Sequence, residues 1–291
     1  MIVYLNGQFV EEAEARVSVF DRGFLYGDGL FETLRARHGR PFRWEAHWER
    51  LQAGAGRLRL NVTGESGNWR RTLEELLERN QLSDAVVRIQ ITRGVGPRGY
   101  SPRGADAPTV LMSAHPAPVV TPGKPAQVSL ATASLRVLAD DPLARCKTSD
   151  KLRQVLARAE AEERAADEAL LLNHRGEIAE AAGANVFCVQ GGGVVTPPLP
   201  SGALAGVTRA LMSELCESLG FKIAEQNITP EQLRHAEGVF LTNSVQGVME
   251  AVSLDGGPLR QSTLTTQLHA AWWGLLERET QAALPGGGTS V

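Results

Sequence analysis

Residues 21–35, DRGFLYGDGLFETLR, change character halfway along their length. The first half is rich in glycine, which is typical of a loop. The second half, from Leu30 to Arg35, alternates side chains in the way that a β-strand does. This stretch therefore predicts a glycine-rich loop that leads into a strand.

The segments around this stretch alternate between strand and helix signals. Asn6-Gly7 has apolar residues on both sides and predicts the turn of a hairpin over Ile2 to Val10. Trp44, His47 and Leu51 recur at helical spacing and predict a helix over 44–59. The other elements expected in this half are a helix over 69–80 and strands over 86–92 and 109–113.

The second half of the chain shows the same mixture. Strands are expected over 126–132, 168–172, 177–180, 184–189, 221–226, 237–242 and 248–253. Helices are expected over 150–166, 207–219, 230–235 and 264–282. The first of these helices carries one apolar face, made of Leu152, Val155, Leu156 and Ala159. The pattern predicts an α+β or α/β fold in two halves, with mixed sheets flanked by helices.

A proline-rich stretch separates the two halves. It contains His115-Pro116-Ala117-Pro118 and then Thr121-Pro122-Gly123-Lys124-Pro125, a composition typical of a linker. We therefore expect an N-terminal domain over 1–115, a linker over 116–125 and a C-terminal domain over 126–283. The glycine-rich residues 284–291 are expected to form a flexible tail.

The composition excludes several classes of protein. The chain has 291 residues, 43% of them apolar, and a formal net charge of −3, which argues against a nucleic-acid binder with a basic face. No apolar run reaches the roughly 18 residues that span a bilayer, and the N-terminus lacks the pattern of a signal peptide. Cys146, Cys188 and Cys216 have no metal-ligand spacing. We expect a cytoplasmic protein with free thiols, no metal and no membrane partner.

Lysine is rare in this chain, so each lysine is worth inspecting. Of the 30 basic residues, four are lysines and the rest are arginines. A lysine can lose its proton and act as an amine nucleophile, whereas an arginine cannot. Lys147 stands between a loop and an expected helix, a place from which its side chain can be held inward. The alternative is an ordinary solvated lysine.

Three further segments carry groups that suit a phosphorylated ring cofactor. Glu180 ends a short strand and runs into small residues that let a flat ligand approach the backbone. Ser201 to Arg209 is a glycine-containing loop that enters a helix, where free N–H groups favour a phosphate. Arg50 adds a second phosphate ligand. Together with Lys147, these groups are the equipment that binds pyridoxal phosphate, although each signal alone also fits an ordinary surface residue.

The sequence resembles the class IV aminotransferase family, the fold-type IV pyridoxal-phosphate enzymes, over about residues 1–255. The resemblance rests on segments that occur in the family's order. They are Asp21-Arg22-Gly23 through Phe31-Glu32-Thr33, His47-Trp48-Glu49-Arg50-Leu51, Lys147 ahead of a helix, Glu180 to Phe187, Gly206-Val207-Thr208-Arg209 and Thr242-Asn243-Ser244.

The resemblance implies a role for each matching residue. Lys147 would bond covalently to the cofactor and later move the proton at the substrate carbon. Glu180 would keep the pyridine nitrogen protonated, and Phe31 would lie near the substrate. The phosphate would be held by Arg50, the backbone of Val207, and the hydroxyls of Thr208 and Ser244. The other three lysines match no motif and are expected to be solvated.

The resemblance of one loop, over residues 93–101, implies which subtype of the family this chain is. Arg93-Gly94 with Arg98-Gly99-Tyr100-Ser101 is similar to the loop of aminodeoxychorismate lyase, which releases pyruvate and p-aminobenzoate. This lyase is the first expectation. Arg98 and Tyr100 are expected to bind the substrate, because they are similar to the residues with which D-amino acid aminotransferases hold the substrate carboxylate. The alternative is an aminotransferase for D-amino acids or (R)-amines. A branched-chain enzyme is less favoured, because Leu152 stands where those enzymes usually have a tyrosine.

The resemblance also implies partners. The family acts on a small-molecule amine or amino acid and is usually a homodimer in which a loop of one chain shapes the site of the other. We therefore expect a homodimer.

Overall fold

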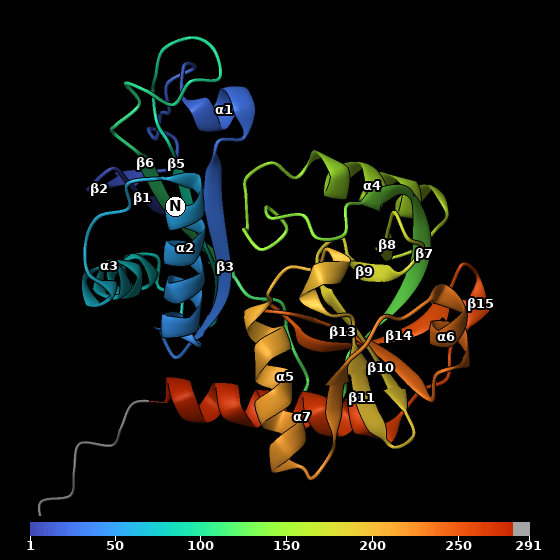
Figure 1. Ribbon diagram of the computed structural model, residues 1–291. Coiled ribbons are helices and arrows are strands. Elements are labelled where there is room, and N and C mark those ends of the chain that lie inside the picture. The colour runs from blue at the N-terminus through green and yellow to red at the C-terminus, as the bar shows by residue number, and fades with distance from the viewer. Residues whose placement is uncertain (282–291) are drawn as a thin grey trace, which may run out of the picture.

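The computed structural model describes residues 1–281 and divides them into two halves, each built on its own sheet (Figure 1). This is the mixed α and β architecture expected from the sequence. The predicted tail over 284–291 lies outside the described residues. No helix among residues 1–281 is long and apolar enough to cross a membrane.

The N-terminal half is a six-stranded antiparallel sheet. In the order in which they pair, its strands are β2 (Gln8–Glu11), β1 (Ile2–Leu5), β6 (Thr109–Pro116), β5 (Ala85–Thr92), β3 (Gly29–Arg37) and β4 (Arg40–Pro41). Helix α2 (Trp44–Leu58) contacts β3, and helix α3 (Ser66–Arg79) contacts β1, β4 and β6. The predicted hairpin is present, because Asn6 and Gly7 both adopt the positive φ that its tight turn requires.

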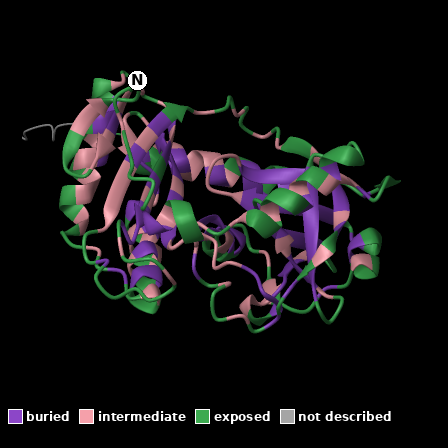
Figure 2. Ribbon diagram, turned by 90° about the horizontal axis from the view of Figure 1, so that it is seen from above, coloured by how far each residue is buried: buried purple, intermediate pink, exposed green. Residues whose placement is uncertain are grey.

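The C-terminal half is a nine-stranded mixed sheet. Its strands pair in the order β12 (Ile223–Glu225), β11 (Gly193–Thr196), β10 (Asn185–Gln190), β13 (Gly238–Asn243), β14 (Gly247–Leu254), β7 (Ala126–Val137), β8 (Glu168–Asn173) and β9 (Ile178–Ala181), with β15 (Gly257–Pro258) beside β14. Its helices are α4 (Leu152–Glu163), the 3-10 turn η1 (Leu199–Ser201), α5 (Val207–Ser218), α6 (Pro230–His235) and α7 (Thr263–Thr280). Buried residues gather on the strands and on the inner faces of the helices (Figure 2).

Helix α7 joins the two halves, because it contacts β3 as well as β13, β14 and α5. Phe42, from the end of the first sheet, packs edge-on against the buried Trp272 of α7, with ring centroids 6.4 Å apart. The two halves therefore share part of one core, which fixes the edge of the N-terminal sheet against the C-terminal half.

Several sequence expectations need correction. Residues 22–26 form a short helix, α1 (Arg22–Tyr26), where a loop was expected, because the side chain of Asp21 caps it by accepting from the N–H of Gly23. Strands β11 and β15 were missed. Strand β6 continues through Pro116, so the connection to β7 spans 117–125.

The expected apolar face of α4 points away from the core. Leu152, Val155 and Leu156 are 64%, 59% and 50% exposed, whereas Ala157 and Ala161 are buried against β7 and β8. Small alanine side chains let the helix lie close to the sheet, and this leaves the bulkier residues away from the sheet, where Leu152 and Leu156 line a cavity.

Candidate active site

A cavity of about 830 Å³ lies between the two halves. The N-terminal half contributes Phe31 and Thr33 from β3 and Arg50 from α2, and the rest of the wall comes from the connecting loop 138–151 and the C-terminal half. Of the residues predicted from the sequence, seven line it: Phe31, Arg50, Lys147, Glu180, Val207, Thr208 and Ser244.

Lys147 lies on a segment that is fastened to strand β3. The N–H of Phe31 donates to the carbonyl oxygen of Lys147 at 3.0 Å, and the N–H of Ser149 donates to that of Gly29 at 2.9 Å. The Lys147 amine lies 4.5 Å from the centre of the Phe31 ring. Burial, with a smaller contribution from the positive charge of Arg50, lowers the pKa of Lys147 to about 8. A larger share of this amine is therefore neutral, and nucleophilic, than in an exposed lysine.

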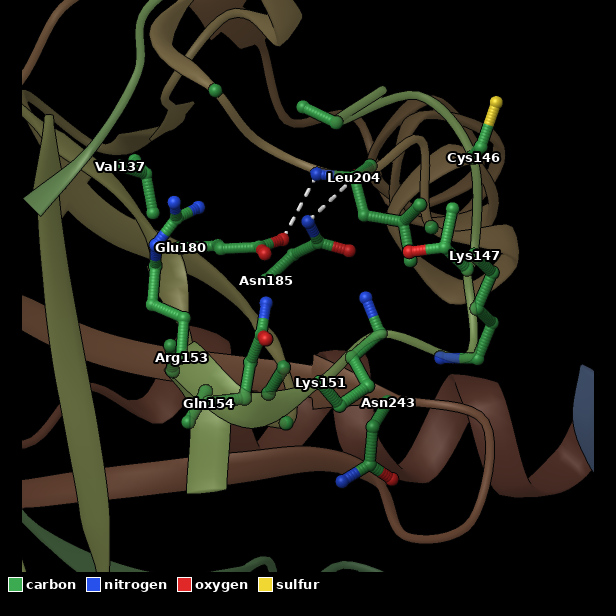
Figure 3. A pocket seen from close by; sticks show the side chains of 18 of the residues that line it. Val137, Cys146, Lys147, Lys151, Arg153, Gln154, Glu180, Asn185, Leu204 and Asn243 are labelled. Carbon is green, nitrogen blue, oxygen red and sulfur yellow. Dashed lines mark hydrogen bonds between the residues drawn. The ribbon is translucent and has the colours of Figure 1, made fainter. Parts of the chain in front are cut away.

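Glu180 lies at the opposite side of the cavity, on β9 (Figure 3). One of its oxygens, Oε2, accepts the N–H of Leu204 at 2.9 Å, while Asn185 donates to the carbonyl of Leu204 at 2.9 Å. Among residues 1–281, no hydrogen bond reaches the other oxygen, Oε1. Burial raises the pKa of Glu180, and the hydrogen bond from the N–H of Leu204, followed by the charges of Lys151 and Lys147, partly offsets this rise. A ring N–H⁺ would supply the partner that Oε1 lacks.

The first turn of α5 forms one end of the cavity. Val207 and Thr208 are the first two residues of the helix, and no side chain caps its N-terminus at Gly206. A Cβ at Gly206 would lie 2.0 Å from Oδ1 of Asn185, so only glycine fits between the helix and that amide. Ser244 lies nearby, on a turn whose N–H groups at Val245 and Gln246 donate to Asn243. This end offers N–H and O–H donors suited to a phosphate.

Arg50 reaches the same end of the cavity from the other half. Its guanidinium donates to Glu32 through Nε at 2.8 Å and Nη2 at 2.6 Å, and to the carbonyl of Ala205 through Nη1 at 3.0 Å. An amine, a carboxylate and a cationic phosphate cradle thus line a single cavity. This donor set fits pyridoxal phosphate.

Arg98 and Tyr100 do not line this cavity. They are on the loop after β5, both are exposed, and Tyr100 packs against Tyr26 with ring centroids 5.5 Å apart. The buried Arg22 holds the loop by donating to the carbonyls of Gly99, Tyr100 and Ser101. The loop therefore has a defined shape outside the cavity of its own chain.

The expectation that three lysines are solvated is wrong for one of them. Lys151 lines the cavity beside Lys147 (Figure 3), and burial lowers its pKa. Lys124 and Lys222 are exposed, as expected.

Sequence reasoning also missed two residues behind the cavity wall, Glu32 and His47, and one in the wall, Asn185. All three stood inside the recognised motifs, but only the fold shows what they contact. The available signal was a carboxylate between apolar residues in the first half of the strand, as at Glu32. Arg88 was missed too: its guanidinium lies 3.9 Å from the centre of the Phe31 ring.

Comparison with known proteins identifies the family. The profile of the family described as amino-transferase class IV matches residues 29–254. A putative branched-chain-amino-acid aminotransferase from Methanocaldococcus jannaschii is 36% identical over 257 residues, which are 88% of each chain. The aminodeoxychorismate lyase of Bacillus subtilis is 31% identical over 87% of each chain. The branched-chain amino acid aminotransferase of Escherichia coli superposes with a TM-score of 0.89 at 27% identity, covering 96% of each chain. This chain belongs to the class IV aminotransferase family and is a pyridoxal-phosphate-dependent enzyme.

Proposed function

We propose that the seven predicted residues that line the cavity form its catalytic and cofactor-binding site. Lys147 bonds to the cofactor and carries the proton at the substrate carbon, and Glu180 holds the protonated ring nitrogen. The phosphate is held by Arg50, by the first turn of α5 and by Ser244. Pyridoxal phosphate, when bound, supplies an aldehyde carbon for the substrate amine and a ring that withdraws electrons from the bonds at the substrate carbon.

We infer that the reaction is transfer of an amino group from an amino acid to a 2-oxo acid. The observation that carries this proposal is the buried amine of Lys147 in the cavity, whose pKa is lowered to about 8, so that it can take up and return a proton; the lyase reaction would use the same amine. The family description and the 36% identity to a protein named as an aminotransferase support it.

Aminodeoxychorismate lyase, the first expectation from the loops, is the second candidate. Two cations beyond Lys147 and Arg50 line the cavity, Lys151 and Arg153, and they suit a substrate with two carboxylates. Aminodeoxychorismate has two carboxylates, but so does a dicarboxylic 2-oxo acid. The loop with Arg98 and Tyr100 lies outside the cavity of its own chain, which weakens the case that the loop alone makes for the lyase.

The position of that loop supports the proposal of a homodimer. Apolar side chains lie exposed on α1 and beside it, with Phe24 76% exposed and Tyr100 87% exposed. A second copy of the chain would cover them and could bring Arg98 to the partner's site. Size-exclusion chromatography with light scattering distinguishes the dimer from a 31.3 kDa monomer. A cytoplasmic location remains a prediction.

One experiment separates the two candidate reactions. The cofactor-loaded protein is mixed with aminodeoxychorismate, and p-aminobenzoate and pyruvate are assayed together. It is also mixed with L- and D-amino acids without an acceptor, and release of 2-oxo acid is measured per site. One equivalent of 2-oxo acid, with no p-aminobenzoate, supports aminotransfer. Equimolar p-aminobenzoate and pyruvate would instead establish the lyase.

A further inference from the structure

Behind Arg50 lie two buried titratable side chains, Glu32 and His47, which form a row with it. Glu32, on β3, is 1% exposed and accepts two hydrogen bonds from Arg50. His47, on the first turns of α2, is 2% exposed, and its Nδ1 lies 2.7 Å from Oε2 of Glu32. Neither Glu32 nor His47 lines the cavity, so neither touches a ligand in it.

The row keeps a negative charge next to Arg50. Burial alone would raise the pKa of Glu32, but the hydrogen bonds from Arg50 and His47 outweigh it and lower that pKa to about 2. Glu32 is therefore ionised at neutral pH. Burial lowers the pKa of His47, so its ring is neutral there and donates its Nδ1 hydrogen to the carboxylate. An ionised carboxylate with three such donors has one fixed orientation.

Glu32 in turn fixes the plane of the Arg50 guanidinium. A guanidinium has five N–H groups, and three of those on Arg50 donate to Glu32 and Ala205. This leaves one N–H on each of Nη1 and Nη2 for a ligand in the cavity. The Ala205 contact adds a second constraint, because Ala205 directly precedes Gly206 at the N-terminus of α5.

We propose that Glu32 and His47 are positioning residues that orient Arg50, so that the guanidinium and the first turn of α5 bind the same phosphate. The proposal rests on the proposed function, in which this end of the cavity binds the cofactor phosphate. It explains why a carboxylate stands close to an anion site, because the negative charge of Glu32 is paired with Arg50. The two remaining N–H groups of Arg50 donate to no other acceptor among residues 1–281.

The proposal predicts a defect that depends on the phosphate group. Glu32→Gln should weaken binding of pyridoxal phosphate to the apoprotein about tenfold or more, the effect of losing a charged hydrogen-bond partner. Binding of pyridoxal, which lacks the phosphate, should stay within about twofold, because Lys147 and Glu180 are untouched. His47→Gln should show a weaker form of the same pattern. Both dissociation constants are measured by titration of absorbance.

The control is a second buried carboxylate, one that does not line the cavity. Glu250, on β14, is 6% exposed and accepts only the N–H of Ser262 at 3.3 Å among residues 1–281. Glu250→Gln should leave both dissociation constants unchanged. If Glu32→Gln does not fold, Glu32→Asp keeps the charge but shortens the reach to Arg50, and the same comparison applies to it.

A double-mutant cycle tests whether Glu32 acts through Arg50. In a protein that already carries Arg50→Lys, the added Glu32→Gln change should cost far less phosphate-dependent affinity than in the wild type. Equal weakening of pyridoxal phosphate and pyridoxal, or additive effects in the cycle, would overturn the proposal. A wild-type protein that binds pyridoxal but gains nothing from the phosphate would overturn the proposed phosphate site itself, which is a different result.

Discussion

The guanidinium of Arg35 donates a hydrogen bond of 2.9 Å to the carbonyl oxygen of Val245, which is 210 residues further along the chain. Arg35 is fully buried on β3. It also donates twice to Asp84, on the loop before β5, and once to the carbonyl of Pro118, in the connection between the halves. Val245 adjoins Ser244 in the wall of the cavity. One side chain thus fastens the sheet, the connection and the cavity turn together.

Replacing this arginine should loosen the joint between the two halves. Arg35→Met removes four hydrogen bonds and leaves the carbonyls of Val245 and Pro118 without this donor, while Asp84 keeps its ion pair with Arg37, a loss of about 2 to 4 kcal/mol. The midpoint of thermal unfolding should fall by at least about 4 °C. Arg175→Met is the matched control, because the ion pair of Arg175 with Asp140 lies on the surface. A change no larger than that of the control would show that the joint does not depend on Arg35.

Lys147→Ala should give a folded protein that binds the cofactor without a covalent bond. Turnover should fall at least about 1000-fold, because both the bonding amine and the proton carrier are lost. Borohydride should fix the cofactor to a peptide containing residue 147 in the wild type and to none in the variant. Lys124→Ala, at an exposed lysine, is the control.

Mass spectrometry of the trapped peptide also tests Lys151, the second amine in the cavity. Cofactor fixed to residue 151 in the wild type would contradict the assignment of Lys147. Fixation to residue 151 in Lys147→Ala alone would show that Lys151 is within reach of the aldehyde but is not the normal partner.

The lowered pKa of Lys147 means that this residue destabilises the folded apoprotein when its amine is protonated. The pKa falls from 10.5 to about 8 on folding, so the folded state resists protonation of this amine. The destabilisation is complete below pH 8 and disappears as the pH rises towards 10.5. Lys147→Met should therefore raise the free energy of unfolding of the apoprotein at pH 7 by about 1 to 3 kcal/mol, with a smaller gain at pH 10. Urea unfolding at both pH values measures it, and a gain independent of pH would contradict the stated cause.

The sequence predicted those site residues that belong to short, continuous motifs. Glu180 stands near the end of a strand, Thr208 stands in the first turn of a helix, and Lys147 stands in the loop before α4, and short motifs mark such places. The structure puts all three around one cavity. The hairpin at Asn6-Gly7 was predicted for the same reason, because its turn residues are consecutive. Helix α6 (Pro230–His235) was also predicted, and the structure shows that a capping box of Thr229 and Gln232 begins it.

Contacts between distant segments could not be predicted in this way. The pairing of Glu32 with Arg50 joins a strand to a helix, and that of Arg35 with Val245 joins the two halves. Periodicity shows that α4 has an apolar face, but it does not show whether the sheet accepts that face or the smaller alanines. In this structure the sheet contacts the alanines, and Leu152 is therefore exposed.

The glycine before α5 offers a test of the anion site that leaves every charged side chain in place. A Cβ at Gly206 would lie 2.0 Å from Oδ1 of Asn185, so Gly206→Ala must shift the first turn of the helix or that amide. Since Val207 and Thr208 follow directly, we expect about tenfold weaker binding of pyridoxal phosphate and little change for pyridoxal. Gly67→Ala is the control, because Gly67 lies in the first turn of α3 with no atom within 4 Å of an added Cβ. That change should be neutral or slightly stabilising. Unaltered affinity in Gly206→Ala would mean that the phosphate does not depend on the N-terminus of α5, and Arg50 with Ser244 would then have to hold it alone.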